Sequence, residues 1–111
     1  MTVTAVYSHA NEAFNAIARA HRLVPFDVRL LVALHERGGE GRTDELEVDM
    51  QTEGTAIRRS YPPMAARRLL AADAGSGTTR PKRGVRTRLT LTTAGRNVAL
   101  AALTRAETDR G

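Results

Sequence analysis

Arginines dominate the residues of this chain that could do chemistry. Residues 54–96 hold ten cations against Asp73 alone, a net charge of +9, and nine of the ten are arginines. The planar fork of a guanidinium fits phosphate oxygens and the edge of guanine better than a lysine ammonium does. A solvated surface on which arginine replaces lysine would explain part of this pattern. The concentration in one stretch favours a surface that binds nucleic acid.

The rest of the chain is neutral or acidic. Residues 1–41 and 97–111 each have a net charge of zero, whereas residues 42–53 carry one arginine against five acids. The whole chain has a net charge of +5 and a pI of about 10.9, which permits nucleic acid or an anionic membrane surface as a partner. Because the acidic segment directly precedes the arginines, its side chains must either face away from DNA or oppose binding there.

Enzymatic and metal chemistry find little support. The chain has no cysteine, which excludes a disulfide scaffold, a thiolate metal site and a thiol nucleophile. The three histidines form no helical His-x-x-x-His pair, and the GGEGRT segment lacks the lysine of a phosphate-binding loop. Acids at 44, 45, 47 and 49 are more typical of a solvated helix face than of paired catalytic carboxylates. We predict a protein that is not an enzyme and has no cofactor, metal site or catalytic residue.

Length and composition predict one domain over residues 1–111. A chain of this length buries enough surface for a single core. Hydrophobic residues make up 41% and aromatic residues only 4%, so aliphatic side chains must build the core, which favours helices. No apolar run approaches the roughly 20 residues of a membrane span, and the first residues lack the pattern of a signal peptide. We expect a soluble cytoplasmic protein without a membrane partner.

Apolar spacing and capping residues predict four helices and one loop. The first flanking helix covers 8–22, with Ser8 as its cap. The next covers 25–37, begins at Pro25 and is stopped by Gly38 and Gly39, and the GGEGR segment that follows reads as a loop. The short acidic helix DELEVDMQ is capped by Thr43, and the last flanking helix, 93–106, is capped by Thr92 or Thr93.

The segment between the acidic helix and Gly75 contains an obstacle. A turn at 52–54 leads into a helical stretch, but Pro62 and Pro63 follow within it. A proline inside a helix removes a hydrogen bond and clashes with the preceding turn. We therefore expect a kink or break near Tyr61, with a second helical piece that starts at Pro62 or Pro63 and ends before Gly75.

Residues 85–91 alternate as a half-buried strand does. Val85, Thr87, Leu89 and Leu91 share one face, and Arg86, Arg88 and Thr90 share the other. Paired with residues 76–79, this strand makes a hairpin. Its tip carries Arg80, Lys82 and Arg83.

The predicted order is helix, helix, short acidic helix, turn, helix, basic hairpin, helix. This is the winged helix-turn-helix arrangement, a mainly α fold with a small β-hairpin. Residues 23–96 resemble the MarR family of winged-helix transcription regulators. The resemblance rests on the spacing of Leu31, Leu46 and Met50, on T-E-G-T-A-I-R-R at 52–59, on L-A-A-D-A-G at 70–75, and on L-T-T-A-G-R at 91–96.

The resemblance implies a sequence-specific regulator that binds double-stranded DNA. A major groove admits a recognition helix, whose first residues reach base edges, while a basic wing reaches a flanking backbone or minor groove. The candidate DNA contacts are Thr52, Thr55, Ala56, Arg58 and Arg59 in the recognition segment and Arg80, Lys82, Arg83, Arg86 and Arg88 in the wing.

The sequence leaves two other functions open. The acidic stretch and the proline pair would suit a winged helix that binds protein, and a basic wing would suit an architectural or recombination accessory factor that bends DNA.

Apolar stripes on both flanking helices predict a homodimer. Neither an operator nor a small-molecule effector can be named from the sequence. The expected dimer seam consists of Ala10, Phe14 and Ile17 on the first helix and Val98, Ala102 and Leu103 on the last.

Overall fold

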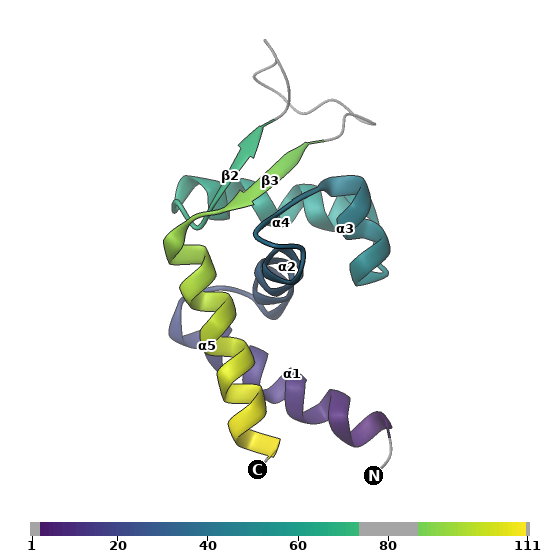
Figure 1. Cartoon of the computed structure of the whole chain (residues 1–111), viewed down its shortest axis with the longest axis vertical. Helices are drawn as coiled ribbons and strands as arrows, with labels where there is room; N and C mark the ends of the chain where they lie inside the picture. The colour runs from purple at the N-terminus through teal and green to yellow at the C-terminus, as the bar shows by residue number, and fades with distance from the viewer. Residues whose placement is uncertain (1–2, 74–86, 111) are drawn as a thin grey trace.

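The computed structural model describes residues 3–73 and 87–110, with side chains for 12–73 and 87–107. Its helices and strands follow the order of a winged helix, so the predicted mainly α fold with a small sheet is confirmed (Figure 1). The elements are α1 Val3–Ala20, α2 Pro25–Glu36, β1 Glu40–Arg42, α3 Thr43–Met50, α4 Gly54–Ala66, β2 Leu70–Asp73, β3 Arg88–Leu91 and α5 Thr93–Arg110.

Helix α2 lies at the centre of the molecule. Figure 1 shows α3 and α4 on one side of it, with β2 and β3 beyond them, and shows α1 and α5 extending in the opposite direction. Leu30, Leu31 and Leu34 of α2 are fully buried. Each such side chain stabilises the fold by about 1.5–3 kcal/mol through removal of apolar surface from water. Other buried side chains come from the neighbouring elements: Leu46 of α3, Ile57 and Met64 of α4, Leu70 of β2, and Leu89 of β3.

Both ends of α2 follow the sequence signals. Pro25 is the first residue of the helix, and Gly38 and Gly39 take positive φ values of 85° and 105° after its end. The Gly39 N–H donates to the carbonyl of Leu34 at 2.9 Å, which closes the last turn. The GGEGR segment is not wholly a loop, however, because Glu40–Arg42 form β1. Three residues are too short to show alternation, and this strand depends on β3, which lies beside it.

The sheet is antiparallel with the order β1-β3-β2. Thr87, Leu89 and Leu91 are buried while Arg88 and Thr90 are exposed, as the alternation predicted. The strand that pairs with residues 88–91 differs from the predicted one. Residues 70–73, which we expected to be helical, pair with β3 in a register that places Leu70 opposite Leu91. Residues 76–79 and Val85 lie outside the described residues.

Helix α4 runs through Pro62 and Pro63 without the break predicted near Tyr61. Both prolines are exposed, so the carbonyls four residues earlier, which lose their helical N–H partners, lie toward water. The opposite face is held in the core by Ile57 and Met64, both fully buried. Tertiary packing therefore overrides the local preference of the proline pair.

The same helix ends earlier than predicted. It stops at Ala66, and Arg68 then adopts a left-handed φ of 60°. The Leu69 N–H donates to the carbonyl of Met64 at 3.0 Å, which closes the helix end. The expected second helical piece up to Gly75 is replaced by this turn and β2.

At the starts of the helices, one predicted cap is confirmed and two predictions are wrong. The Thr92 hydroxyl accepts the Gly95 N–H at 3.1 Å, so Thr92 caps α5. Thr43 does not cap α3, because it is the first residue of that helix and its hydroxyl accepts the Thr87 N–H at 3.3 Å. Helix α1 begins at Val3 rather than near Ser8.

The two terminal helices pack against each other within one chain. Val98 is 3% exposed and Ala102 is fully buried, so these two residues do not form the exposed seam predicted on the last helix. They are covered because α5 packs against both α1 and α2. Phe14, Ile17 and Leu103 are half-buried at the edge of the core, and the side chain of Ala10 is outside the described set. Within the described residues, no helix is both long enough and apolar enough to cross a membrane.

Gly95 is the position where α5 comes closest to the turn after α4. A Cβ at this position would overlap the carbonyl oxygen of Leu69, which also accepts the Thr92 N–H at 3.2 Å. At an exposed helix site, glycine to alanine stabilises a protein by about 1 kcal/mol. Here we expect Gly95→Ala to lower the free energy of unfolding by about 2 kcal/mol, because backbone must move. Urea denaturation measures the change. Exposed Asn97→Ala is the control, and a stabilised Gly95→Ala protein would contradict the packing.

Candidate nucleic-acid interface

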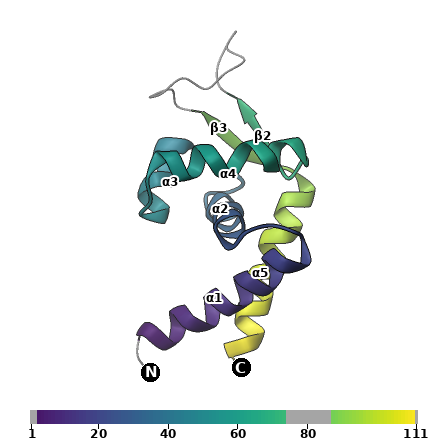
Figure 2. The same cartoon turned by 180° about the vertical axis from the view of Figure 1, so that it is seen from behind.

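Helix α4 presents one face to solvent. Its exposed residues recur at helical spacing, and the opposite face carries Ile57, Ser60, Tyr61 and Met64 into the core. The turn of 51–53 joins it to α3, with Gln51 in the left-handed region at φ 51°. Figure 2 shows α3 and α4 together as the outer layer over α2. The exposed stripe consists of Thr55, Arg59, Pro62, Pro63 and Ala66.

The predicted contacts of the recognition segment divide by exposure. Thr55 and Arg59 lie on the exposed stripe, whereas Ala56 and Arg58 are half-buried at its side. Arg58 Nη2 donates to Thr55 Oγ1 at 3.3 Å, so its guanidinium folds back toward the start of the helix. Thr52 is half-buried in the turn before α4. The two prolines, whose type predicts only an obstacle to the helix, also belong to this exposed stripe.

Polar contacts tie α4 to the corner between α1 and α2. Ser60 Oγ donates to Asp27 Oδ1 at 2.6 Å, and the other oxygen of Asp27 accepts the Val24 N–H at 3.3 Å. Just beyond the helix, Arg67 donates to the carbonyl oxygens of His21 and Arg22, at 2.5 and 3.2 Å. These contacts orient α4 against the corner between α1 and α2. No spacing rule could reveal them, since the partners lie more than 30 residues apart.

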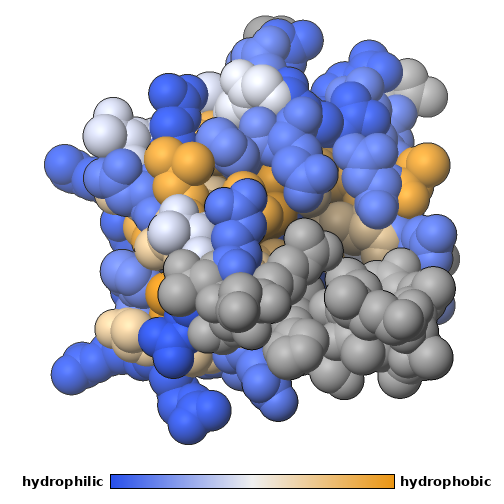
Figure 3. Space-filling model, turned by 60° about the horizontal axis from the view of Figure 1, so that its bottom comes forward, coloured by the Kyte–Doolittle hydropathy of each residue, from blue (hydrophilic) through white to orange (hydrophobic). Residues whose placement is uncertain are grey.

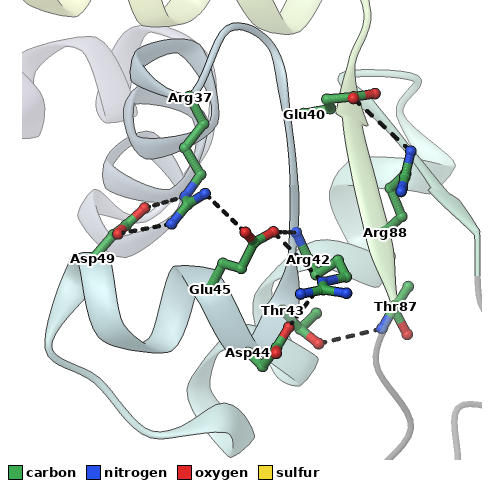
Figure 4. Close-up of polar contacts among 9 residues, drawn as sticks. All are labelled: Arg37, Glu40, Arg42, Thr43, Asp44, Glu45, Asp49, Thr87 and Arg88. Atoms are coloured by element: carbon green, nitrogen blue, oxygen red, sulfur yellow. Dashed lines mark hydrogen bonds and ion pairs between the residues drawn. The ribbon is translucent and has the colours of Figure 1, made fainter.

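The acids of α3 are largely held by arginines of the same chain. Figure 4 shows Arg37, at the end of α2, donating to both Glu45 and Asp49, with 3.0 Å between Arg37 and Glu45. Arg42 lies 3.5 Å from Asp44 and 3.6 Å from Glu45. Exposed pairs of this kind contribute little stability each. Their effect is to pair three of the four acids of α3 with positive charges of the same chain.

Arg37 stays charged throughout the pH range in which the protein can be studied. Its hydrogen bond to Asp49 and the charges of Asp49 and Glu45 raise its pKa above the ordinary value for arginine. A raised pKa means that the stabilising contribution is present at all lower pH values, as far as Arg37 itself is concerned. Arg37 therefore links the end of α2 to α3 through its ion pairs with Glu45 and Asp49.

The base of the wing is fixed to the start of α3. The Thr43 N–H donates to the carbonyl of Thr87 at 2.9 Å, and Thr87 itself is buried. Arg88 is exposed on β3, 3.9 Å from Glu40. It is the one predicted wing contact that the structure places. The other four, Arg80, Lys82, Arg83 and Arg86, lie outside the described residues.

A groove of about 700 Å³ lies between the terminal helices and the helix-turn-helix. Its apolar side chains come from four helices, and Arg29, Glu36 and Asp49 add charge. Thr52 of the recognition segment also lines it. Figure 3 views the molecule from the side of the terminal helices, where apolar side chains show between hydrophilic ones. The apolar side chains of the groove are Phe14, Phe26, Val32, Ala33, Met50 and Leu103. Among the described residues, no group of three His, Asp or Glu side chains could hold a metal ion.

Comparison with solved structures identifies the fold. BpsR of Bordetella bronchiseptica superposes with a TM-score of 0.71 at 19% identity, covering 97% of this chain and 77% of that one. Reduced MarR of E. coli gives 0.72 at 15% identity, covering 96% and 74%. A MarR mutant in complex with operator DNA gives 0.67 at 12% identity, covering 96% and 72%. The fold is a MarR-like winged helix. No protein-family model and no curated protein matches the chain.

In this fold α3 and α4 form the helix-turn-helix, and β2 and β3 enter the wing. The resemblance of residues 23–96 to MarR regulators, which rested on short motifs, is thereby confirmed at the level of fold. The last of those motifs also gains a physical reason: in L-T-T-A-G-R the threonine before α5 is its cap, and the glycine lets α5 approach the Leu69 carbonyl.

The part-buried hydrogen bond between Ser60 and Asp27 gives a test of how α4 is held. Ser60→Ala leaves a carboxylate oxygen of Asp27 without its donor, and we expect the free energy of unfolding to fall by about 1–3 kcal/mol. Urea denaturation measures the loss. Thr55→Ala removes a hydroxyl from the exposed side of the same helix and should change stability by less than about 0.5 kcal/mol. Equal losses in the two variants would contradict the anchoring role of Ser60.

Proposed function

We propose that this protein is a DNA-binding transcription regulator that inserts α4 into the major groove. The observation that carries the proposal is the exposed stripe of α4, which holds Thr55 and Arg59, in a winged helix with a net charge of +5. Arginine donates two hydrogen bonds to a guanine edge, and threonine reaches a phosphate or a thymine methyl. The solved complex of a MarR mutant with operator DNA supports the same use of the fold here.

The remaining contacts follow from their places in the sequence and the fold. Thr52, Ala56 and Arg58 flank the exposed stripe at the start of α4 and would complete base and phosphate contacts. Arg88 would bind a phosphate at the base of the wing. The other wing cations, Arg80, Lys82, Arg83 and Arg86, would lie along a flanking backbone or minor groove, where arginine is favoured electrostatically.

We further propose that the regulator acts as a homodimer. A single recognition helix reads few base pairs, and two-fold pairing doubles the site. The burial of Val98 and Ala102 removes them from the interface, which leaves half-buried Phe14, Ile17 and Leu103 and the 42% exposed Leu100 on the terminal helices.

Selection from a pool of random duplexes, followed by footprinting, tests the proposal. We expect one enriched sequence with two symmetric half-sites about 10 base pairs apart. Light scattering should show that the protein that binds it has twice the 12.0 kDa mass of one chain. The logarithm of the affinity should fall linearly with the logarithm of salt concentration, by about 0.9 per phosphate contacted. Absence of binding in low salt would favour a protein-interaction module. Binding without enrichment would favour an architectural factor.

Arg59→Ala distinguishes base reading from positioning within that experiment. We expect a loss of about 1–3 kcal/mol in binding to the enriched sequence, with relaxed preference at one base pair. Arg105→Ala, which removes an exposed arginine of α5, is the charge-matched control. An equal loss for enriched and random duplexes would assign Arg59 to the phosphate backbone instead.

The groove favours a second property, control of DNA binding by a small aromatic acid. The DNA binding of BpsR is regulated by 6-hydroxynicotinic acid. Here the groove joins Phe14 and Phe26 with the cation of Arg29, which suits an aromatic ring that carries a carboxylate. Because Thr52 also lines the groove, a ligand there would contact the turn before the recognition helix.

Titration of the protein–DNA complex with 6-hydroxynicotinic acid tests this regulation. We expect about a 5- to 100-fold weaker affinity for the enriched duplex when the acid is bound, the range of ordinary coupling between sites. Ala33→Trp fills the groove and should abolish the effect while preserving DNA binding. An unchanged affinity at millimolar acid, or an equal response from Ala33→Trp, would contradict the groove as the site for this acid.

A further inference from the structure

Glu47 is the acid of α3 that forms no ion pair with Arg37 or Arg42. Asp44, Glu45 and Asp49 pair with Arg37 and Arg42, whereas Glu47 lies on the last turn of α3, next to the start of α4. Its carbonyl accepts the Thr52 N–H at 3.0 Å, which fixes its backbone against the turn. Its side chain is half-buried.

Gly54 shows where this carboxylate points. A Cβ added to Gly54 would lie 2.7 Å from Glu47 Oε1 and 2.9 Å from Arg58 Nη1. The carboxylate and the guanidinium therefore converge on the same side of the first residue of α4. Glu47 Oε1 and Arg58 Nη1 are thus at most 5.6 Å apart, the sum of these two distances, and opposite charges within about 6 Å attract each other. Arg58 is held from its other side by Thr55 Oγ1, at 3.3 Å.

The start of α4 lacks an acid of its own. No acidic residue lies in its first turn, and Glu53 before it makes no side-chain capping bond. A helix start carries partial positive charge and favours a carboxylate or a phosphate. Glu47, supplied by the preceding helix, thus occupies the position beside Arg58 that a DNA phosphate would otherwise find attractive.

We propose that Glu47 is a specificity-determining residue that acts by restraining Arg58. This inference rests on the proposed DNA-binding function. In random-sequence DNA a phosphate gains little from Arg58, because it must displace Glu47 and meets its negative charge. A guanine edge in the correct place offers Arg58 two directed hydrogen bonds without a second negative charge near Glu47. Glu47 therefore weakens non-specific binding more than specific binding.

Glu47→Gln tests the proposal, since glutamine keeps the shape above Gly54 and removes the charge. We expect the affinity for random-sequence duplex to rise about threefold to tenfold, and the salt slope for that duplex to steepen by about 0.9, one added phosphate contact. The affinity for the duplex enriched by the wild-type protein should change less, so the ratio of the two affinities falls. Glu107→Gln changes the net charge equally at the far end of α5 and should leave this ratio unchanged (Figure 1).

Arg58→Ala separates the restraint of Arg58 from simple repulsion of DNA. If Glu47 acts through Arg58, Glu47→Gln should no longer raise random-duplex affinity in the Arg58→Ala background. A full rise in that background, or equal changes for both duplexes in the single variant, would overturn the proposal. Glu47→Asp retains the charge but withdraws it, and random-duplex affinity intermediate between wild type and Glu47→Gln would support it. If the wild-type protein itself binds no duplex, the proposed function fails. If the wild-type protein binds the enriched duplex selectively and with a salt-dependent affinity, but Glu47→Gln leaves both affinities unaltered, this inference alone fails.

Discussion

Burial of most of the circumference of α2 is the constraint on which the structure depends. Val28, Leu30 and Leu31 point in different directions around the helix, and all three are fully buried. A helix that is apolar around most of its circumference must be enclosed by other elements. Helices α1, α3, α4 and α5 and the strands β1 and β3 all contact it, so α2 is the element that joins the terminal helices to the rest of the domain.

Polar contacts then fix the orientation of the helices, which apolar burial alone does not fix. Apolar packing is not directional, whereas a hydrogen bond to a defined atom fixes rotation and register. Asp27 holds the middle of α4, the carbonyls of His21 and Arg22 hold the residue after its C-terminal end, and Arg37 holds α3. The helix-turn-helix is therefore fastened to both ends of α2, one end through the α1–α2 corner and the other through Arg37.

The sequence predicted the fold where local chemistry and the fold agree. Pro25, the glycine pair after α2, the Thr92 cap and the alternation through Leu89 all combine a local preference with a role in packing. Prediction failed where the secondary structure of a segment depends on a partner that is far away in the sequence. Residues 70–73 look helical by composition but pair with β3, and Glu40–Arg42 become a strand only beside the same partner. For the candidate site, composition indicated arginines, but neither the restraint of Arg58 beside Glu47 nor the groove could be read from spacing.

The proline pair also has a consequence for the order in which the molecule folds. An isolated helix of 13 residues is marginal in water even with good helix formers, and α4 contains two residues that cannot donate a helical hydrogen bond. The segment cannot nucleate itself. It becomes helical only when Ile57 and Met64 find a surface already formed by α2. The helical shape of α4 is thus a property of the whole domain rather than of its own thirteen residues.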